Sequence, residues 1–158
     1  MRLPLALVLS LALATAAPAR AADAPLKPGP QEKCPVCGMF VAKYPAWVAA
    51  VTFADGSRLL FDGAKDLFKF LQDPARWVPG RTRADVKAIL VTDYYDLAPV
   101  DARGAFFVLG SDTFGPMGEE LVPLARKADA EEFLRDHHGK RIVRFDEVTP
   151  VLLKTLDD

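Results

Sequence analysis

The sequence is poor in the side chains that bind transition metals or exchange disulfides. It has two cysteines, two histidines and three methionines, one of which is Met1. Cys34 and Cys37 form a single Cys-x-x-Cys pair. The absence of a second pair disfavours a zinc ribbon, because that site needs four ligands. Metal or redox chemistry in this chain must therefore centre on Cys34 and Cys37.

The sequence also lacks a strong excess of charge and a hydrophobic run long enough to cross a membrane. The formal net charge is −1 at pH 7, which argues against nucleic acid as a partner. The apolar run over residues 3–16 is interrupted only by Pro4, Ser10 and Thr15. It is shorter than the about 20 residues that a transmembrane helix needs. We therefore expect no membrane span.

The first residues have the pattern of a secretory signal peptide, predicted over residues 1–21. Arg2 supplies the positive charge, and Ala19-Arg20-Ala21 fits the small-x-small cleavage rule. Cleavage after Ala21 would remove two of the 20 basic side chains and leave 18 against 21 acidic ones, a net charge of −3. No cysteine lies near the cleavage site. We expect a periplasmic protein without a lipid anchor.

The rest of the chain has the size of one domain preceded by a short linker. Residues 22–33 are rich in proline and glycine and are interpreted as a flexible, extended tether. Residues 34–158 are expected to form a single α+β domain. The chain is 51% hydrophobic, so this domain can bury a core without disulfides.

The first half of the domain predicts a β-hairpin followed by a helix. Residues 47–54 and 58–61 are rich in aliphatic and aromatic side chains, and Asp55-Gly56 between them is a strong signal for a two-residue hairpin turn. Residues 63–73 are expected to form a helix. The predicted unit is strand, strand, helix.

The expected helix has a start signal, an apolar side and a stop signal. Asp62 stands where a helix N-cap belongs, and Pro74 follows the last turn. Leu67, Phe68 and Leu71 recur at helical spacing. This apolar side is predicted to pack against the hairpin.

The remaining sequence repeats the same kinds of element. Further strands are expected at residues 86–92, 105–109, 120–125 and 141–145, and further helices at 129–137 and 146–156. Pro123 places the strand that contains it at a sheet edge. Each half then has the order strand, strand, helix, strand. Two ββαβ units, with pseudo-repeats 34–98 and 99–158, are an economical architecture, and an internal duplication is one interpretation of it.

The Cys-x-x-Cys pair is followed by a methionine, and these sulfurs suggest a metal site. Two residues between Cys34 and Cys37 make a tight turn in which both thiols can face one point, and Met39 follows Gly38. Thiolate and thioether are soft ligands that suit Cu(I). The pair also fits a redox dithiol, half of a zinc site, or a structural disulfide, which an oxidising compartment favours where no metal holds the thiols.

Two other residues are candidate ligands. Met117 lies between glycines and a proline in the expected loop 110–118, with little local core to fill, and could close over the turn that carries Met39. Methionine is also a common core residue, which remains the alternative. His138 follows a predicted helix and could be a third type of ligand, although helix C-termini favour histidine on dipole and solvation grounds.

Together these motifs resemble the NosL family. The resemblance rests on Cys34-x-x-Cys37-Gly38-Met39, Phe61-Asp62-Gly63 after the hairpin, Gly115-Pro116-Met117-Gly118, His138-Gly139 and Phe145-Asp146-Glu147-Val148. That family supplies copper during maturation of nitrous oxide reductase. The resemblance implies a periplasmic Cu(I)-binding accessory protein rather than an enzyme, with a duplicated ββαβ fold similar to the alkylmercury lyase domain.

The resemblance also implies a ligand set and partners. Carried over by motif, Cys37 and Met39 are the first ligands, Cys34 and Met117 come next, and His138 is a further candidate. The implied partners are the copper ion, a client copper enzyme such as nitrous oxide reductase, and assembly factors. The alternative interpretation is a periplasmic thiol–disulfide oxidoreductase that uses the two cysteines.

The signal-peptide prediction can be tested on the exported protein. The mature chain should begin at Ala22 and carry no lipid, because the cleavage pattern ends at Ala21 and no cysteine is near it. Intact-mass and peptide mass spectrometry of the periplasmic fraction would check both points. A chain that retains Met1, or a lipid adduct, would contradict the prediction.

Overall fold

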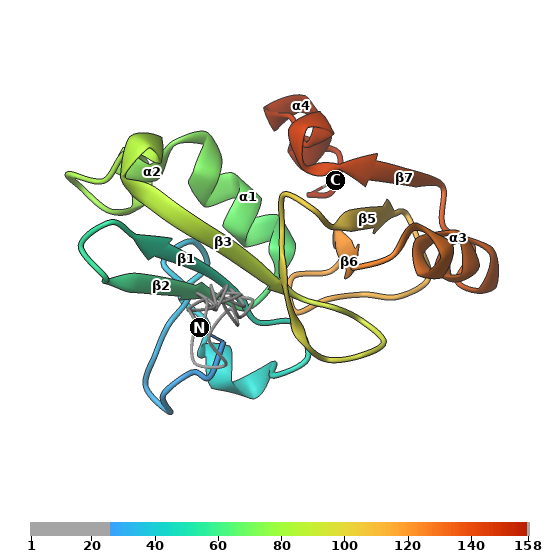
Figure 1. Cartoon of the computed structure of the whole chain (residues 1–158), viewed down its shortest axis with the longest axis horizontal. Helices are drawn as coiled ribbons and strands as arrows, with labels where there is room; N and C mark the ends of the chain where they lie inside the picture. Colours follow the sequence, from blue (N-terminus) through green and yellow to red (C-terminus); the bar gives the residue numbers. More distant parts are fainter. Residues whose placement is uncertain (1–25, 158) are drawn as a thin grey trace, which may run out of the picture.

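The computed structural model describes residues 26–157, so the predicted signal peptide lies outside the described residues. The chain forms two antiparallel sheets and a set of short helices (Figure 1). The first sheet has the order β2-β1-β3-β4, and the second has the order β6-β5-β7. The strands are β1 (Ala49–Phe53), β2 (Arg58–Phe61), β3 (Val86–Thr92), β4 (Pro99–Asp101), β5 (Phe106–Leu109), β6 (Val122–Leu124) and β7 (Arg141–Arg144). The helices are α1 (Ala64–Gln72), α2 (Pro74–Trp77), α3 (Lys127–Asp136) and α4 (Pro150–Lys154), with 3-10 turns η1 (Val41–Lys43), η2 (Arg83–Asp85) and η3 (Phe145–Glu147).

The two sheets are built in the same way. In each, a hairpin is followed by a helix and then by a strand that pairs antiparallel with the first strand of the hairpin: β1, β2, α1, β3 and then β5, β6, α3, β7. The predicted α+β class is confirmed. Strand β4 has no counterpart in the second sheet, and the sequence did not predict it.

The predicted hairpin is present. Strands β1 and β2 pair antiparallel, with Ala49 opposite Phe61. Gly56 has a φ of 83°, in the left-handed region that favours glycine, and the N–H of Ser57 donates to the Asp55 carboxylate at 2.9 Å. The turn residues therefore fix the register of the two strands.

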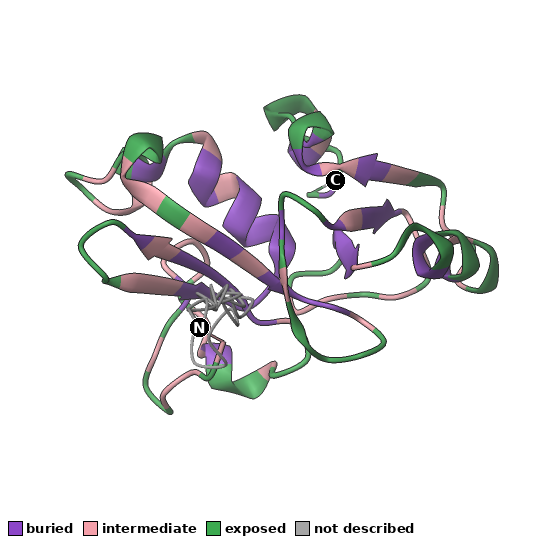
Figure 2. Ribbon diagram, viewed as in Figure 1, coloured by how far each residue is buried: buried purple, intermediate pink, exposed green. Residues whose placement is uncertain are grey.

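Helix α1 lies between the two sheets and is buried along most of its length (Figures 1 and 2). Towards the hairpin, the Phe70 ring contacts Phe53 and Phe61, with ring centroids 6.4 and 5.3 Å apart. Towards the second half, the Phe68 ring contacts Phe107 and Phe145, both at 5.1 Å. The helix therefore joins the two halves of the core.

The contacts of Phe68 differ from the sequence prediction, which placed this ring on the hairpin. Phe70 contacts the hairpin instead. A helix covered on two sides carries apolar residues around most of its surface, so helical spacing alone does not tell which sheet each residue faces.

The second sheet is covered on both faces. Along β5, Phe107 and Leu109 belong to the main core, whereas Val108 belongs to a smaller core that includes Phe133 of α3. This alternation follows from the two-residue period of a strand. Strand β6, which contains Pro123, is an edge strand as predicted.

Some helix boundaries differ from the predictions. Helix α3 begins at Lys127, two residues before Asp129. The predicted closing helix is split into a 3-10 turn and α4, which begins after Thr149, whose side chain accepts the Leu152 N–H at 3.3 Å. Proline at the first position of α4 fits this start.

The segment before the first cysteine contacts the domain from Leu26 onward. Leu26 packs against the main core, and the Glu32 carboxylate forms an ion pair with Arg58 at 3.1 Å. Within residues 26–157, none of the helices has the length and apolar character needed to cross a membrane.

The central position of α1 predicts that its core side chains are required for stability. Leu71 is 2% exposed, and Leu71→Ala should lower the free energy of unfolding by about 2–5 kcal/mol because it leaves a cavity. Val151 is 76% exposed, and Val151→Ala should change it by less than about 0.5 kcal/mol. Urea unfolding followed by circular dichroism measures both values, and equal effects of the two substitutions would contradict the packing.

Candidate metal centre

The cysteine motif forms a closed turn at the edge of the first sheet. Lys33 and Phe40 pair across its base. Inside it, the Cys34 N–H donates to the Met39 carbonyl and the Gly38 N–H donates to the Cys34 carbonyl, both at 2.9 Å. Gly38 has a φ of 78°, which favours glycine at this position. These backbone hydrogen bonds thus hold both cysteines within one short loop.

Backbone N–H groups point at both sulfurs. The backbone N–H groups of Val36 and Cys37 near Sγ of Cys34, and that of Met39 near Sγ of Cys37, act to lower the pKa of the two thiols. Such donors stabilise a thiolate, because they place positive partial charges beside it. Cys34 is buried, whereas Cys37 is partly exposed. Burial outweighs this effect on the pKa, but the donors would stabilise the thiolates once a metal ion replaces the protons.

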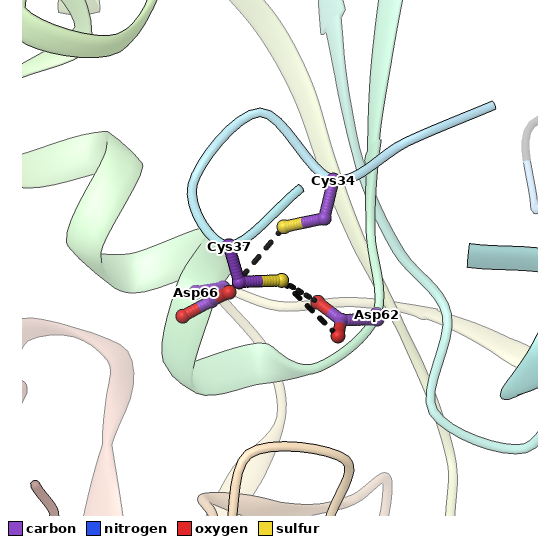
Figure 3. A group of neighbouring side chains, drawn as sticks. All are labelled: Cys34, Cys37, Asp62 and Asp66. Carbon is purple, nitrogen blue, oxygen red and sulfur yellow. Dashed lines mark hydrogen bonds between the residues drawn. The ribbon is translucent and has the colours of Figure 1, made fainter. Parts of the chain in front are cut away.

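Two carboxylates, one just before α1 and one in its first turn, complete the site (Figure 3). The Cys37 thiol donates to Asp62, with Sγ 3.3 Å from both carboxylate oxygens, and the Cys34 thiol donates to Oδ2 of Asp66 at 3.3 Å. One ligand atom from each of the four residues lies within 4.8 Å of the others. Both aspartates are buried. These four groups could hold a metal ion.

Burial keeps the thiols protonated before a metal binds. It raises the pKa of Cys37 to about 12, and the nearby Asp66 carboxylate acts in the same direction. Burial raises the pKa of the Cys34 thiol even further, and it also raises the pKa of Asp66. A thiol must lose its proton to bind a metal. The two aspartates stand where they can accept these protons.

The donor set fits a soft cation that is attracted by negative charge. The two sulfurs supply the soft ligands that Cu(I) prefers, and the carboxylates supply the negative charge. Met39 lies in the same turn and is partly buried. The group combines two thiols and two carboxylates, and the role of Met39 as a ligand stays a prediction.

The structure places the other two candidate ligands differently from each other. The backbone of Met117 lies beside the first turn of α1, because Lys65 Nζ donates to the Met117 carbonyl at 2.8 Å. The Met117 side chain is 42% exposed. His138 is exposed just beyond α3, which lies far from the cysteine turn in Figure 1. His138 is not in the group formed around Cys34 and Cys37, and its role as a ligand stays a prediction.

The sequence reasoning missed both aspartates. It assigned Asp62 as the N-cap of the helix, which is wrong: the N-cap is Gly63, and the Asp62 carboxylate faces the Cys37 thiol. Asp62 precedes the extended N-cap Gly63, whereas Asp66 lies in the first turn of α1, so helical spacing does not relate the two carboxylates. The local sequence therefore offered no signal for their convergence on the cysteines.

Fold and site together define a small α+β protein with a candidate metal centre between a cysteine turn and a helix start. The family model of NosL matches residues 25–153, and the chain belongs to the NosL family. The resemblance found in the sequence motifs is thereby confirmed.

Two relatives show how this chain compares with known members. The copper-binding lipoprotein NosL of Stutzerimonas stutzeri is 28% identical over 124 residues, which cover 78% of this chain and 65% of the relative's length. The crystal structure of the copper chaperone NosL from Shewanella denitrificans is 31% identical and has a TM-score of 0.66, covering 79% of this chain and 95% of that one. The fold is thus that of a solved NosL protein.

The different burial of the two thiols predicts an order of chemical modification. In the metal-free, reduced protein, an alkylating reagent should modify Cys37 before Cys34, which is 1% exposed. Both should react slowly at pH 8, because the thiolate is the reactive form and both thiols donate to carboxylates. Mass spectrometry of digested samples gives the two rates. In the urea-unfolded control both should react alike and fast, and equal rates in the folded protein would contradict the arrangement.

Proposed function

We propose that this protein binds Cu(I) between the cysteine turn and α1 and delivers it to a client copper enzyme, nitrous oxide reductase or a similar one, outside the cytoplasm. The observation that carries the proposal is the convergence of Cys34, Cys37, Asp62 and Asp66 within 4.8 Å. The names of the two NosL relatives, copper chaperone and copper-binding lipoprotein, support it.

The sulfur chemistry favours Cu(I) as the cargo. Two thiolates with one or two thioethers, from Met39 and Met117, form a soft donor set, and soft donors select Cu(I) over magnesium, calcium or manganese. Backbone N–H groups already point at both sulfurs, so little rearrangement of the turn is needed when the thiols lose their protons.

A delivery protein must also release its ion, and the exposure of the site supports exchange. Cys37 is partly exposed, and Met117 presents 42% of its surface to solvent. A ligand from a client protein can therefore approach from the side of Cys37, while Cys34 holds the ion from within. Low-coordinate sulfur sites permit such stepwise exchange of ligands.

The thiol environment favours binding over disulfide exchange. A catalytic dithiol needs a thiolate stabilised by a helix N-terminus or a nearby cation. Here the pKa of the Cys37 thiol is raised to about 12 by burial, and the nearest charged side chains are carboxylates. The pair lies in a turn and precedes the 3-10 turn η1 instead of opening an α-helix. These features support the metal-binding proposal over the oxidoreductase.

The proposal predicts which substitutions weaken Cu(I) binding. Cys37→Ser and Met39→Ile should each weaken it more than tenfold, a loss of more than about 1.4 kcal/mol, because each removes a soft ligand. Cys34→Ser should have a similar effect if both thiols bind the ion. Competition with a Cu(I) chelator under anaerobic, reducing conditions measures the affinities. Asp73→Asn, at the other end of α1, is a control that should leave affinity unchanged.

Two further measurements separate the proposal from its rival. Thermal unfolding should show that the variants remain folded, and X-ray absorption of the Cu(I) form should show sulfur scatterers. Undiminished affinity in Cys37→Ser, or a spectrum fitted by nitrogen and oxygen alone, would remove the copper proposal. Activity in a disulfide-reduction assay would then favour the oxidoreductase.

A further inference from the structure

The loop that carries Met117 forms a rigid turn. The N–H of Gly115 donates to the carbonyl of Gly118 at 2.8 Å, and the N–H of Gly118 donates back to the carbonyl of Gly115 at 3.2 Å. Pro116 and Met117 therefore stand at the tip of a two-residue turn. Gly118 has a φ of 84°, which this turn requires and glycine supplies.

A buried carboxylate connects this turn to α1. Glu120 is 3% exposed, and its Oε1 accepts the N–H groups of Lys65 at 2.5 Å and Leu121 at 2.8 Å. Its side chain fills the space between two glycines. A Cβ on Gly115 would lie 2.9 Å from the Glu120 Cγ, and one on Gly63 would overlap the carboxylate. The turn and the helix start thus meet through Glu120.

A buried ammonium holds the same turn from a second direction. Lys65 is 2% exposed, and its Nζ donates to the carbonyls of Met117 at 2.8 Å and Leu156 at 3.1 Å, with Asp157 at 3.5 Å. A buried charge requires such partners, because leaving one unpaired is strongly unfavourable. The Met117 backbone is therefore fixed to the residue that precedes Asp66.

We propose that Lys65 and Glu120 are positioning residues that hold Met117 at the open side of the Cu(I) site. This inference rests on the proposed function. Met117 comes from the loop between β5 and β6, 52 residues after Lys65 in the chain. Without these two contacts its thioether would have to be ordered each time an ion arrives, which weakens binding.

The two positioning residues belong to, or contact, the short segment that also carries the site carboxylates. Asp62 precedes Gly63, which Glu120 contacts, and Asp66 follows Lys65. The segment from Asp62 into the first turn of α1 therefore places Asp62 and Asp66 against the cysteine turn and, through Lys65 and Glu120, fixes the backbone of the Met117 turn. The same short segment thus contacts both the cysteine turn and the loop that carries Met117.

Lys65→Leu tests the proposal, because leucine keeps helix propensity and fills apolar space without adding a sulfur, but cannot donate to the Met117 carbonyl. Cu(I) affinity should fall about 10- to 100-fold, the range found when residues that orient metal ligands are changed. X-ray absorption should show one sulfur scatterer fewer than in the wild type. Lys69→Leu is the matched control one turn further along α1, where Lys69 pairs with Asp157 rather than with the Met117 carbonyl.

Gly115→Ala is a second variant that leaves every charge in place. Its added Cβ should push the turn away from Glu120 and lower Cu(I) affinity in the same way. Gly104→Ala is its control, because a Cβ there would make only an ordinary contact at 3.6 Å. This variant keeps the proposal testable if Lys65→Leu does not fold.

Combination with Met117→Ile separates positioning from general damage to the fold. If Lys65 acts through Met117, Lys65→Leu should cause no further loss of affinity in the Met117→Ile background. Wild-type affinity in both Lys65→Leu and Gly115→Ala, or an undiminished further loss in the Met117→Ile background, would overturn the positioning role. Undiminished affinity in Cys37→Ser would instead overturn the proposed function itself.

Discussion

The structure depends on the burial of one helix start between two sheets. The first turn of α1 is enclosed by the hairpin, the cysteine turn and the loop after β5, so each polar group on it must find a partner from another segment. The Asp66 carboxylate accepts a hydrogen bond from the Cys34 thiol, and the Lys65 N–H donates to the Glu120 carboxylate. The Lys65 ammonium donates to the carbonyls of Met117 and Leu156. The need to satisfy buried polar groups is what gathers the candidate metal ligands in one place.

The same constraint explains the balance of charge in the site. Two thiols and two carboxylates in one buried cluster would repel one another if all were ionised, so the thiols remain protonated and donate to the carboxylates. A cation that binds in the cluster would offset the repulsion between thiolates and carboxylates, so the thiols could then lose their protons. The site is thus stable without its ion and still prepared to bind one.

Signals from residues that are neighbours in the sequence were sufficient to predict the two turns. The Asp55-Gly56 turn and the cysteine turn depend on residues that are neighbours in the chain, and both could be predicted. The partners of the cysteines could not, because Asp62 and Asp66 reach them only through tertiary packing. For the same reason the contacts of Phe68 were assigned to the wrong sheet. Strand β4 was missed because three residues at a sheet edge leave almost no pattern.

The hydrogen bond between Lys65 and the Leu156 carbonyl has a consequence for the order of folding. It joins residues that are 91 positions apart in the sequence, so the buried ammonium obtains this partner only after the segment around α4 has packed against α1. The two hydrogen bonds inside the cysteine turn join residues that are close neighbours in the sequence. The cysteine turn can therefore form early, whereas the start of α1 is completed only when a distant segment closes over it.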